Sequence, residues 1–465
     1  MTAASTDRPV TGSPPSRRVY IRTYGCQMNV YDSERMAELL APLGYARTEV
    51  PEAADLIVLN TCHIREKAAE KVYSDLGRLV PLRTSARRAG RRVRFVVAGC
   101  VAQAEGAEIR RRRPEVDIVV GPQTYHRLPE LLARADRANA TATICTDFPA
   151  ERKFDELPSR SRPGPAAFLS VQEGCDRFCT FCVVPYTRGA EYSRPVADVV
   201  REAESLVRQG ARELCLLGQN VNAYHGLDRS GRENSLAGLL RELARIDGVA
   251  RLRYTTSHPA NMTEELIRAH GDLEALMPYL HLPVQSGSDR VLRAMNRAHT
   301  AESFRATVRA LRGSRSDLAL SSDFIVGFPG ETERDFEATL QLVEETGFAA
   351  AYSFRYSRRP GTPAAVLTHQ VPEPEKARRL SILQALLADQ QHSFNRGFMN
   401  ATVPVLFERR GRRPEQLTGR SPWMHAVHVD ADESLLGALR PVRVTRAGPH
   451  GLAGVLANHS EVAAA

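Results

Sequence analysis

The sequence predicts an α/β protein with an N-terminal parallel α/β domain, a central partial (β/α)6 barrel and a small C-terminal β-barrel. Three observations support this fold class. Apolar strands alternate with amphipathic helical stretches over residues 17–133, and the same alternation returns over 164–395. Short β-like runs separated by turn residues then fill 396–463.

The N-terminal domain is predicted from four apolar strands and two helices between them. The strands are expected at 19–25, 54–62, 93–102 and 116–121, and the helices at 33–45 and 65–80. Strands that alternate with helices in this way favour a parallel sheet.

Three of these strands end in a cysteine: Cys26, Cys62 and Cys100. Ligands of open α/β sheets gather at the carboxyl ends of the strands, so the three thiols should meet at one edge. Gly25 and Gly99 directly precede two of them and allow the backbone to approach an inorganic group closely. We interpret the three residues as a cluster site; the alternative is three buried structural cysteines.

Two segments have the composition of connecting chain. Residues 1–16 are polar and rich in Pro and Ser without an apolar core, which predicts a disordered leader rather than a signal peptide. Residues 134–163 turn polar and rich in Pro, Arg and Ser, which predicts a linker.

The central domain is predicted to hold six strand-helix units, fewer than a closed eight-stranded barrel. The strands are expected at 168–174, 213–221, 252–259, 280–288, 318–330 and 348–357. A barrel of this kind places its chemistry at the carboxyl ends of its strands. The C-terminal β-like runs lie at 402–411, 425–429 and 439–448.

A second group of cysteines, Cys175, Cys179 and Cys182, follows the first strand of the central domain. A 4Fe-4S cluster has four irons, so three thiolates leave one iron open for a ligand that is not protein. S-adenosylmethionine (SAM) can chelate that iron and be cleaved to a radical, which makes this a predicted radical-SAM loop. A zinc knuckle would want a fourth Cys or His close by, and the next cysteine is Cys215.

Composition and charge indicate the kind of partner and the cellular setting of this protein. The chain has 465 residues, a net charge of +9 and a pI near 9.3, which favours an acidic partner such as nucleic acid. We expect a cytoplasmic enzyme without membrane spans, and eight cysteines that serve as metal ligands or buried thiols rather than disulfides. Cys145 and Cys215 have no partners in the pattern and are predicted to be structural.

The motifs TYGCQMN, NTCHIREKA, AGCVAQ, EGCDRFCTFCVVPYTRG, LGQNVNAY, TSHP, HLPVQSGSDRVLRAMNR and DFIVGFPGET follow one another in this chain. Together they resemble the methylthiotransferase family of radical-SAM enzymes, and most the MiaB type, the tRNA-2-methylthio-N6-dimethylallyladenosine synthases. The resemblance implies a methylthiotransferase domain over 17–133, a radical-SAM core over 164–395 and an RNA-binding TRAM domain over 396–463.

The resemblance further implies methylthiolation at C2 of N6-isopentenyladenosine 37 of tRNA. One SAM would be the methyl donor and another the radical source. By motif match, Cys26, Cys62 and Cys100 would hold an auxiliary 4Fe-4S cluster, and the second group of cysteines the SAM-binding one. The implied partners are the anticodon stem-loop of tRNA, a sulfur donor and an electron donor such as a flavodoxin or ferredoxin, and the implied state is a monomer.

Polar side chains at the ends of the predicted barrel strands are candidate SAM contacts. They are Gln219, Asn220, Ser257, Gln285 and Ser286, together with Phe181 between the loop cysteines. Arg188 and Arg194 after the loop could meet phosphates or form ordinary ion pairs. The run from Arg409 to Arg413 is expected to contact the RNA backbone.

Three other functions stay open from the sequence. Close relatives would methylthiolate threonylcarbamoyladenosine in tRNA, or an aspartate of a ribosomal protein. The third is a non-catalytic RNA-binding protein whose iron-sulfur clusters are only structural.

Overall fold

The computed structural model describes residues 17–63, 68–137, 143–149, 153–161 and 163–457. The leader predicted over 1–16 and the end of the C-terminal domain from 458 onward lie outside the described residues. By internal contacts the chain forms two compact units. One ends at Ser159 and also includes Tyr186–Arg188, and the other comprises Arg160–Pro185 and the chain from Gly189 onward.

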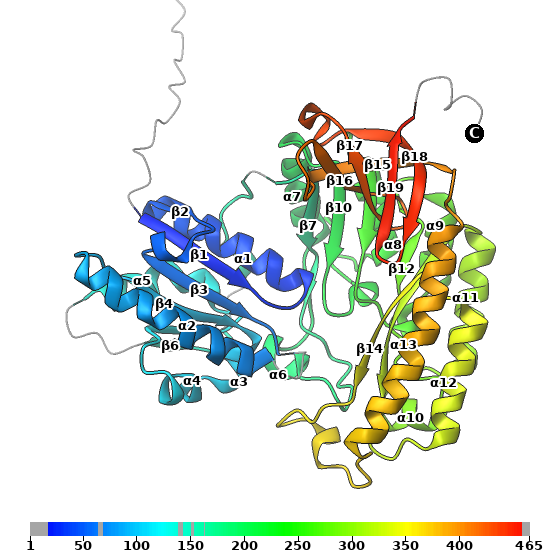
Figure 1. The fold of residues 1–465 in the computed structure, drawn as a ribbon, viewed down its shortest axis with the longest axis horizontal. Helices are drawn as coiled ribbons and strands as arrows, with labels where there is room; N and C mark the ends of the chain where they lie inside the picture. The colour runs from blue at the N-terminus through cyan, green and yellow to red at the C-terminus, as the bar shows by residue number, and fades with distance from the viewer. Residues whose placement is uncertain (1–16, 64–67, 138–142, 150–152, 162, 458–465) are drawn as a thin grey trace, which may run out of the picture. The chain divides into compact units, whose positions relative to one another are not determined.

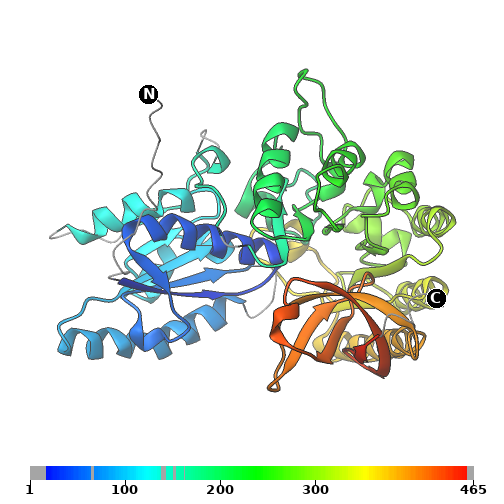
Figure 2. The ribbon, with the colours of Figure 1, turned by 90° about the horizontal axis from the view of Figure 1, so that it is seen from above.

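The N-terminal unit is built on a six-stranded sheet in the order β2-β1-β3-β4-β5-β6, and every neighbouring pair is parallel. Figure 2 shows helices on both faces of this sheet. The strands are β1 (Arg17–Thr23), β2 (Tyr45–Arg47), β3 (Leu56–Thr61), β4 (Arg94–Gly99), β5 (Ile118–Val120) and β6 (Thr143–Cys145). The helices are α1 (Gln27–Leu40), α2 (Ala68–Arg88), α3 (Cys100–Glu105), α4 (Ala107–Arg112) and α5 (Leu128–Asp136).

Two apolar layers explain why the middle strands are uninterrupted hydrophobic runs. All six residues of β3 are buried, because alternate side chains face opposite layers of helices. Leu56 and Val58 pack in a layer with residues of α1 and α5, whereas Ile57 and Leu59 pack with residues of α2. The predicted parallel α/β domain is therefore confirmed.

One strand of this sheet lies where the sequence predicts a linker. β6 pairs in parallel with β5 and buries Cys145 in the layer that holds α5. Only three residues long, β6 follows a polar stretch, so its pattern is too short for period-two alternation to reveal it.

The second unit contains the six predicted parallel strands, arranged as two three-stranded sheets (Figure 1). One sheet has the order β11-β10-β7 and the other β12-β13-β14. The strands are β7 (Ala166–Ser170), β10 (Glu213–Leu217), β11 (Arg251–Tyr254), β12 (Tyr279–His281), β13 (Ala319–Val326) and β14 (Ala350–Arg355). Their helices are α7 (Val196–Arg208), α8 (Leu236–Ala244), α9 (Glu264–Asp272), α10 (Asp289–Ala294), α11 (Ala301–Ser314), α12 (Glu333–Thr346) and α13 (Glu373–Arg396).

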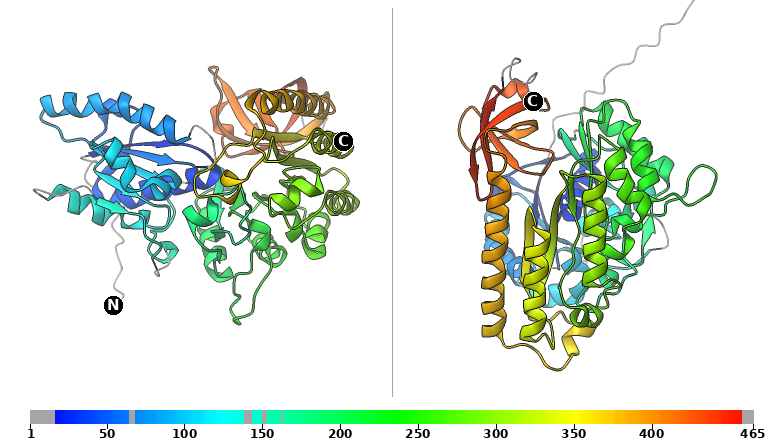
Figure 3. Two further views of the ribbon diagram at one scale, coloured as in Figure 1. Left: turned by 90° about the horizontal axis from the view of Figure 1, so that it is seen from below. Right: turned by 90° about the vertical axis from the view of Figure 1, so that its right-hand side faces the viewer.

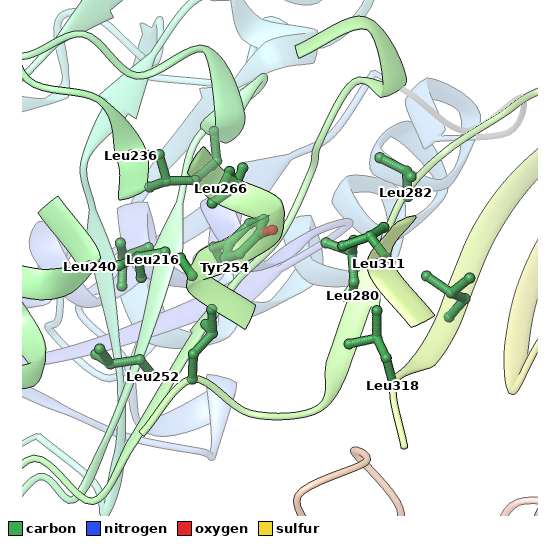
Figure 4. Close-up of a cluster of buried hydrophobic side chains, with 14 of the residues drawn as sticks. Leu216, Leu236, Leu240, Leu252, Tyr254, Leu266, Leu280, Leu282, Leu311 and Leu318 are labelled. Carbon is green, nitrogen blue, oxygen red and sulfur yellow. The ribbon is translucent and has the colours of Figure 1, made fainter. Parts of the chain in front are cut away.

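Leucines from these strands and helices form the core of the second unit. Figure 4 shows Leu216 and Leu252 of the first sheet with Leu240 of α8, and Leu280 with Leu311 of α11 near the second sheet. All five are completely buried. Helices α8, α9 and α11 are amphipathic and turn these apolar faces inward, so the strand ends are left to carry polar residues.

Five strands close into a barrel at the C-terminal end of the second unit, in the order β15-β16-β17-β19-β18. They are β15 (Thr402–Arg410), β16 (Gln416–Arg420), β17 (Ala426–Asp430), β18 (Leu439–Gly448) and β19 (Gly451–Leu456). Figure 3 shows the long helix α13 leading into the barrel. The predicted small β-barrel is confirmed, and β16 and β19 are the strands that the sequence pattern did not reveal.

Two buried arginines of β11 hold this barrel. Arg251 donates to the carbonyls of Arg420 (2.7 Å) and Pro404 (2.8 Å). Arg253 donates to the carbonyls of Ser421 (2.9 Å) and Pro422 (2.7 Å) and pairs with Glu213 at 2.9 Å. The barrel therefore contacts the first and third residues of β11.

In the part of the chain that the structure describes, no helix combines the length and apolar character needed to cross a membrane.

Candidate cluster and cofactor sites

Three cysteines lie at the carboxyl edge of the N-terminal sheet. Cys62 directly follows β3 and Cys100 directly follows β4, and these strands are neighbours with Thr61 opposite Gly99. β1, the other neighbour of β3, ends at Thr23, and Cys26 follows three residues later as the N-cap residue of α1. The sheet order β1-β3-β4 therefore gathers the three cysteines at one edge, as the strand pattern predicts.

Glycines make the close approach at this edge possible. A Cβ atom at Gly25 would lie 2.2 Å from Cys62 Cβ and 2.7 Å from Cys62 Sγ, and Gly25 has a φ of +103°. At Gly99, whose φ is +88°, a Cβ atom would lie 2.4 Å from the carbonyl oxygen of Thr61. A side chain at either position would force apart the segments that carry the cysteines.

Hydrogen bonds and charges connect these thiols with one another. The Cys62 thiol donates to Cys26 Sγ, and this bond together with the positive charge of Arg188 lowers the pKa of Cys26 to about 6. Burial raises the pKa of Cys100, although Arg188 donates a hydrogen bond to its sulfur and opposes that shift. A thiolate at Cys26 is also favoured by the amide groups of Met28 and Asn29 at the start of α1.

The side chains around the first group of cysteines are tied to the sheet. Asn60 Nδ2 donates to the carbonyl of Asn29 (2.7 Å) and to Ser33 Oγ (2.9 Å), and Asn29 Nδ2 donates to the carbonyl of Thr61 (2.8 Å). Asn60 and Thr61 end β3, and the Asn60 side chain and the Thr61 carbonyl hold α1 against this strand. The Thr61 hydroxyl instead donates to the carbonyl of Ala98 on β4.

The second group of cysteines lies on the loop after β7 and a two-residue strand, β8 (Gln172–Glu173). Gly174 begins the loop with a φ of +79°, and a Cβ atom there would lie 1.9 Å from the carbonyl oxygen of Ala190. The amide of Cys175 donates to Gly189, and the amide of Cys182 donates to the carbonyl of Cys179 (2.9 Å). Backbone hydrogen bonds between residues 175 and 189 therefore contribute to the fold of the loop.

Each thiol of this loop accepts a hydrogen bond. The amide of Val184 donates to Cys182 Sγ (3.5 Å), the amide of Arg177 to the sulfur of Cys175, and Arg297 Nη1 to Cys179 Sγ (3.7 Å). Burial raises the pKa of Cys182 to about 12 and also raises that of Cys175, with neighbouring thiols adding to both shifts. A metal would have to displace these protons, and N–H···S bonds would then stabilise the thiolates.

Among the described residues, no group of three or more His, Cys, Asp or Glu side chains is positioned to hold a metal ion. What the structure does show for each group of cysteines is a shared location, mutual electrostatic influence and hydrogen bonds to sulfur. A 4Fe-4S cluster distributes its thiolates over separate irons, so each thiolate needs to reach only one of them.

Gln219, one of the predicted SAM contacts, binds the backbone of the loop that carries Cys175, Cys179 and Cys182. Its Oε1 accepts from the amide of Gly174 at 2.5 Å, directly before Cys175. Its neighbour Asn220 donates from its backbone to Gln172 Oε1 (3.0 Å) and from its side chain to Asn261 Oδ1 (3.3 Å). Arg177 of the loop also donates to Asn261, so the strand ends and the loop share one polar network.

Several polar atoms near these strand ends are buried and lack a hydrogen-bond partner among the described residues. They include Gln172 Nε2, Asn220 Oδ1, Ser257 Oγ and His258 Nε2. Leaving such atoms unsatisfied is costly, which makes them candidates for contact with a polar ligand. His258 follows Ser257, and burial lowers its pKa to about 2, so its ring is neutral at physiological pH.

The other predicted contacts have structural partners. Ser286 is completely buried, lies 3.3 Å from Thr339 Oγ1 and accepts from the amide of Ser288. Gln285 has a φ of +76°, and its backbone forms hydrogen bonds with Asp323 and Ile325 of β13. Phe181 packs against a small apolar cluster, which comprises Val291, Met295, Phe328, Tyr356 and Ala364.

Arg188 and Arg194 are both buried in ion pairs. Arg188 Nη2 lies 2.6 Å from Asp32 Oδ2, and Arg194 Nη1 lies 2.7 Å from Glu202 Oε2. Of the two roles that the sequence left open, the structure shows the ion pairs. Cys215 lies within β10, and burial raises its pKa to about 12, in keeping with its predicted structural role.

Comparisons with known proteins identify two conserved families in the chain. Residues 18–121 match the model described as "Uncharacterized protein family UPF0004", and residues 169–343 match the radical SAM superfamily. These ranges contain the first and the second group of cysteines, respectively.

Among solved structures, the chain is similar to the radical S-adenosylmethionine methyltransferase TsrM from Kitasatospora setae. The TM-score is 0.55 at 16% identity, over 76% of this chain and 77% of that one. The cobalamin-dependent S-adenosylmethionine radical enzyme OxsB matches with a TM-score of 0.52 at 12% identity, over 80% of this chain and 56% of that one. At these identities the likeness concerns the fold.

A relative from Maricaulis maris (strain MCS10) named tRNA-2-methylthio-N(6)-dimethylallyladenosine synthase is 56% identical over 457 residues. The alignment covers 97% of this chain and 100% of the relative. The chain thus belongs to the tRNA-2-methylthio-N6-dimethylallyladenosine synthase family of radical-SAM enzymes.

Proposed function

We propose that this enzyme methylthiolates C2 of N6-isopentenyladenosine 37 in tRNA, using one SAM as methyl donor and another as radical source. The observation that carries the proposal is the 56% identity, along essentially the whole chain, with a relative that bears this activity in its name. The C2–H bond of adenine is strong and unactivated, so acid-base groups of ordinary pKa cannot exchange it for sulfur. A radical route with a separate sulfur source answers both requirements.

In this proposal Cys26, Cys62 and Cys100 hold an auxiliary 4Fe-4S cluster, and Cys175, Cys179 and Cys182 hold the SAM-binding one. Three protein ligands per cluster leave one iron open, for sulfur at the first site and for SAM at the second. Support comes from the shared sheet edge of the first group and from the hydrogen bond that each sulfur of the second group accepts. The proposed domains are 17–133, 164–395 and 396–463, and the chain passes from the first to the second through 134–163, which includes β6 of the N-terminal sheet.

Residues at the barrel's strand ends are suited to position SAM. The unpartnered buried atoms of Asn220, Ser257 and His258 can bond the amino, carboxylate or hydroxyl groups of this ligand. The neutral ring of His258 adds no positive charge near the sulfonium. We propose that Gln219 holds the cysteine loop in place for SAM. Gln285, Ser286 and Phe181 are proposed to lie near SAM and to keep the neighbouring strand ends and loop in position.

The C-terminal barrel is proposed to bind the tRNA backbone beside the anticodon stem-loop. Arg409 and Arg410 end β15, and Arg412 and Arg413 lie in the turn that leads to β16. Arg410 pairs with Glu433 and Arg413 with Asp430, and both partners of each ion pair are well exposed. Contacts between these arginines and phosphates would fix the position of the tRNA along the protein without reading its sequence. The base itself would be selected in the radical-SAM core.

We infer that the protein acts in the cytoplasm as a monomer, receives electrons from a flavodoxin or ferredoxin and has its sulfur replenished by a separate donor.

Mass spectrometry of tRNA nucleosides tests the proposed substrate. A deletion strain that lacks this protein should accumulate isopentenyladenosine, and returning the gene should restore the 2-methylthio mass increment on that nucleoside. An increment on threonylcarbamoyladenosine instead would assign the substrate to the alternative tRNA reaction. Unchanged tRNA, with a modified aspartate missing from a ribosomal protein, would contradict the RNA substrate altogether.

A further inference from the structure

An arginine from outside the N-terminal sequence range lies beside the first group of cysteines. Arg188 ends the short helix α6 (Val184–Arg188), six residues after Cys182, yet by its contacts it belongs to the N-terminal unit. Gln123 Nε2 donates to the backbone carbonyl of Arg188 at 2.6 Å and so fixes its position. Only 3% of the Arg188 side chain is exposed.

The guanidinium of Arg188 is oriented by two acceptors of helix α1. Its Nη2 donates to Asp32 Oδ2 at 2.6 Å and to Asn29 Oδ1 at 3.3 Å. Asp32 is itself buried, and its other oxygen, Oδ1, lies 3.9 Å from Lys153 Nζ. A planar guanidinium held by several acceptors has a defined direction, so the cation cannot swing toward solvent.

The same guanidinium reaches the proposed cluster ligands. Arg188 donates a hydrogen bond to Cys100 Sγ, and its positive charge acts on both Cys100 and Cys26. Asn29 Oδ1, which accepts from Arg188, also lies 3.7 Å from Cys26 Sγ. Arg188 is thus linked to two of the three proposed ligands, directly to one and through Asn29 to the other.

We propose that Arg188 is a positioning and tuning residue of the auxiliary cluster, whose fixed cation and N–H···S bond raise the reduction potential of that cluster. Reduction adds negative charge to the cluster, and a nearby cation together with hydrogen bonds to ligand sulfur favours the more negative state. Asp32 plays the opposite electrostatic part, because its carboxylate orients Arg188 but partly cancels its charge. The inference rests on the proposed function, since it requires a cluster at Cys26, Cys62 and Cys100.

A potentiometric titration isolates the auxiliary cluster. In full-length protein that carries Cys175→Ala, Cys179→Ala and Cys182→Ala, only the auxiliary cluster should load, and iron analysis should find about four irons per chain. Its midpoint potential is then followed by electron paramagnetic resonance. Absence of iron in this parent protein would overturn the proposed ligand set, and the present inference with it.

The substitutions differ in the direction of the shift they predict. Arg188→Met should move the midpoint potential to more negative values, and Arg188→Lys, which keeps the charge, should recover most of the original potential. Asp32→Asn should move it in the positive direction. Arg35→Met is the matched control, because Arg35 is a buried arginine of α1, the helix that carries Asp32, and it pairs with Glu38. This substitution should leave the midpoint potential unchanged.

Opposite shifts for Arg188→Met and Asp32→Asn would support the proposal, because general loosening of the site would move both in one direction. If Arg188→Met does not load a cluster, the potentials of Arg188→Lys and Asp32→Asn test the tuning role: the first should stay close to the parent's and the second should be more positive. A loaded Arg188→Met protein with the parent's potential, or shifts of the same sign in both variants, would overturn the tuning role.

Discussion

The attachment of the C-terminal barrel leads to a prediction about Arg253. Replacing Arg253 by Met keeps the bulk of the side chain but removes its bond to Glu213 and its bonds to the carbonyls of Ser421 and Pro422. Removing one partner of a buried ion pair costs about 3–5 kcal/mol, because the other charge is left without compensation. Here Arg251 stays 3.7 Å from Glu213, so we expect the lower end, about 3 kcal/mol.

Hydrogen exchange measured by mass spectrometry tests this value locally. About 3 kcal/mol corresponds to roughly a hundredfold change in an opening equilibrium, so amides around Ser421 and His425 should exchange roughly a hundredfold faster. Arg245→Met is the control, because Arg245 pairs with Glu242 on an exposed helix surface and should change little. If barrel amides of Arg253→Met exchange at the parent's rate, the two arginines are not what holds the barrel.

Three further predictions concern the cysteine loops and a buried histidine. Gly25→Ala should reduce the iron content from about eight to about four per chain, because its Cβ would collide with Cys62, and SAM cleavage should persist. Gly174→Ala should also halve the iron, but it should abolish SAM cleavage, since its Cβ would lie 1.9 Å from a backbone carbonyl of the radical-SAM loop. Burial lowers the pKa of His270 to about 3, so the unfolded chain binds a proton that the folded protein refuses, and stability should fall as pH drops from about 6.5 toward 3. Thermal unfolding across this range should show a flatter pH dependence for His270→Gln, which can still accept from Tyr254; an unchanged slope would contradict the assignment.

The fold was predictable where the hydrophobic pattern was long. Strand β3 begins with four consecutive apolar residues, Leu56 to Leu59, and lies within the strand predicted at 54–62. Short or weakly patterned elements were missed. β6 has only three residues, and β19, with the sequence GLAGVL, contains two glycines that lower its apparent strand propensity.

The location of the cysteines was predictable because strand ends share an edge, but their surroundings were not. Gln219, an expected SAM contact, accepts a hydrogen bond from the amide of Gly174, which lies 45 positions away in the sequence. Arg188 could not be assigned to the first cysteine site from its position in the chain, because it follows the cysteines of the second. Both relationships depend on tertiary contacts that leave no periodic signal in the sequence.

The central claim is that two groups of cysteines hold two clusters with different tasks. Reconstituted protein should contain about eight irons per chain, and Cys26→Ala and Cys179→Ala should each retain about four. Incubated with SAM, a reductant and isopentenylated tRNA, Cys26→Ala should still release 5′-deoxyadenosine but form no methylthiolated nucleoside, whereas Cys179→Ala should do neither. Identical behaviour of the two variants, or about four irons in the unmodified protein, would contradict the account.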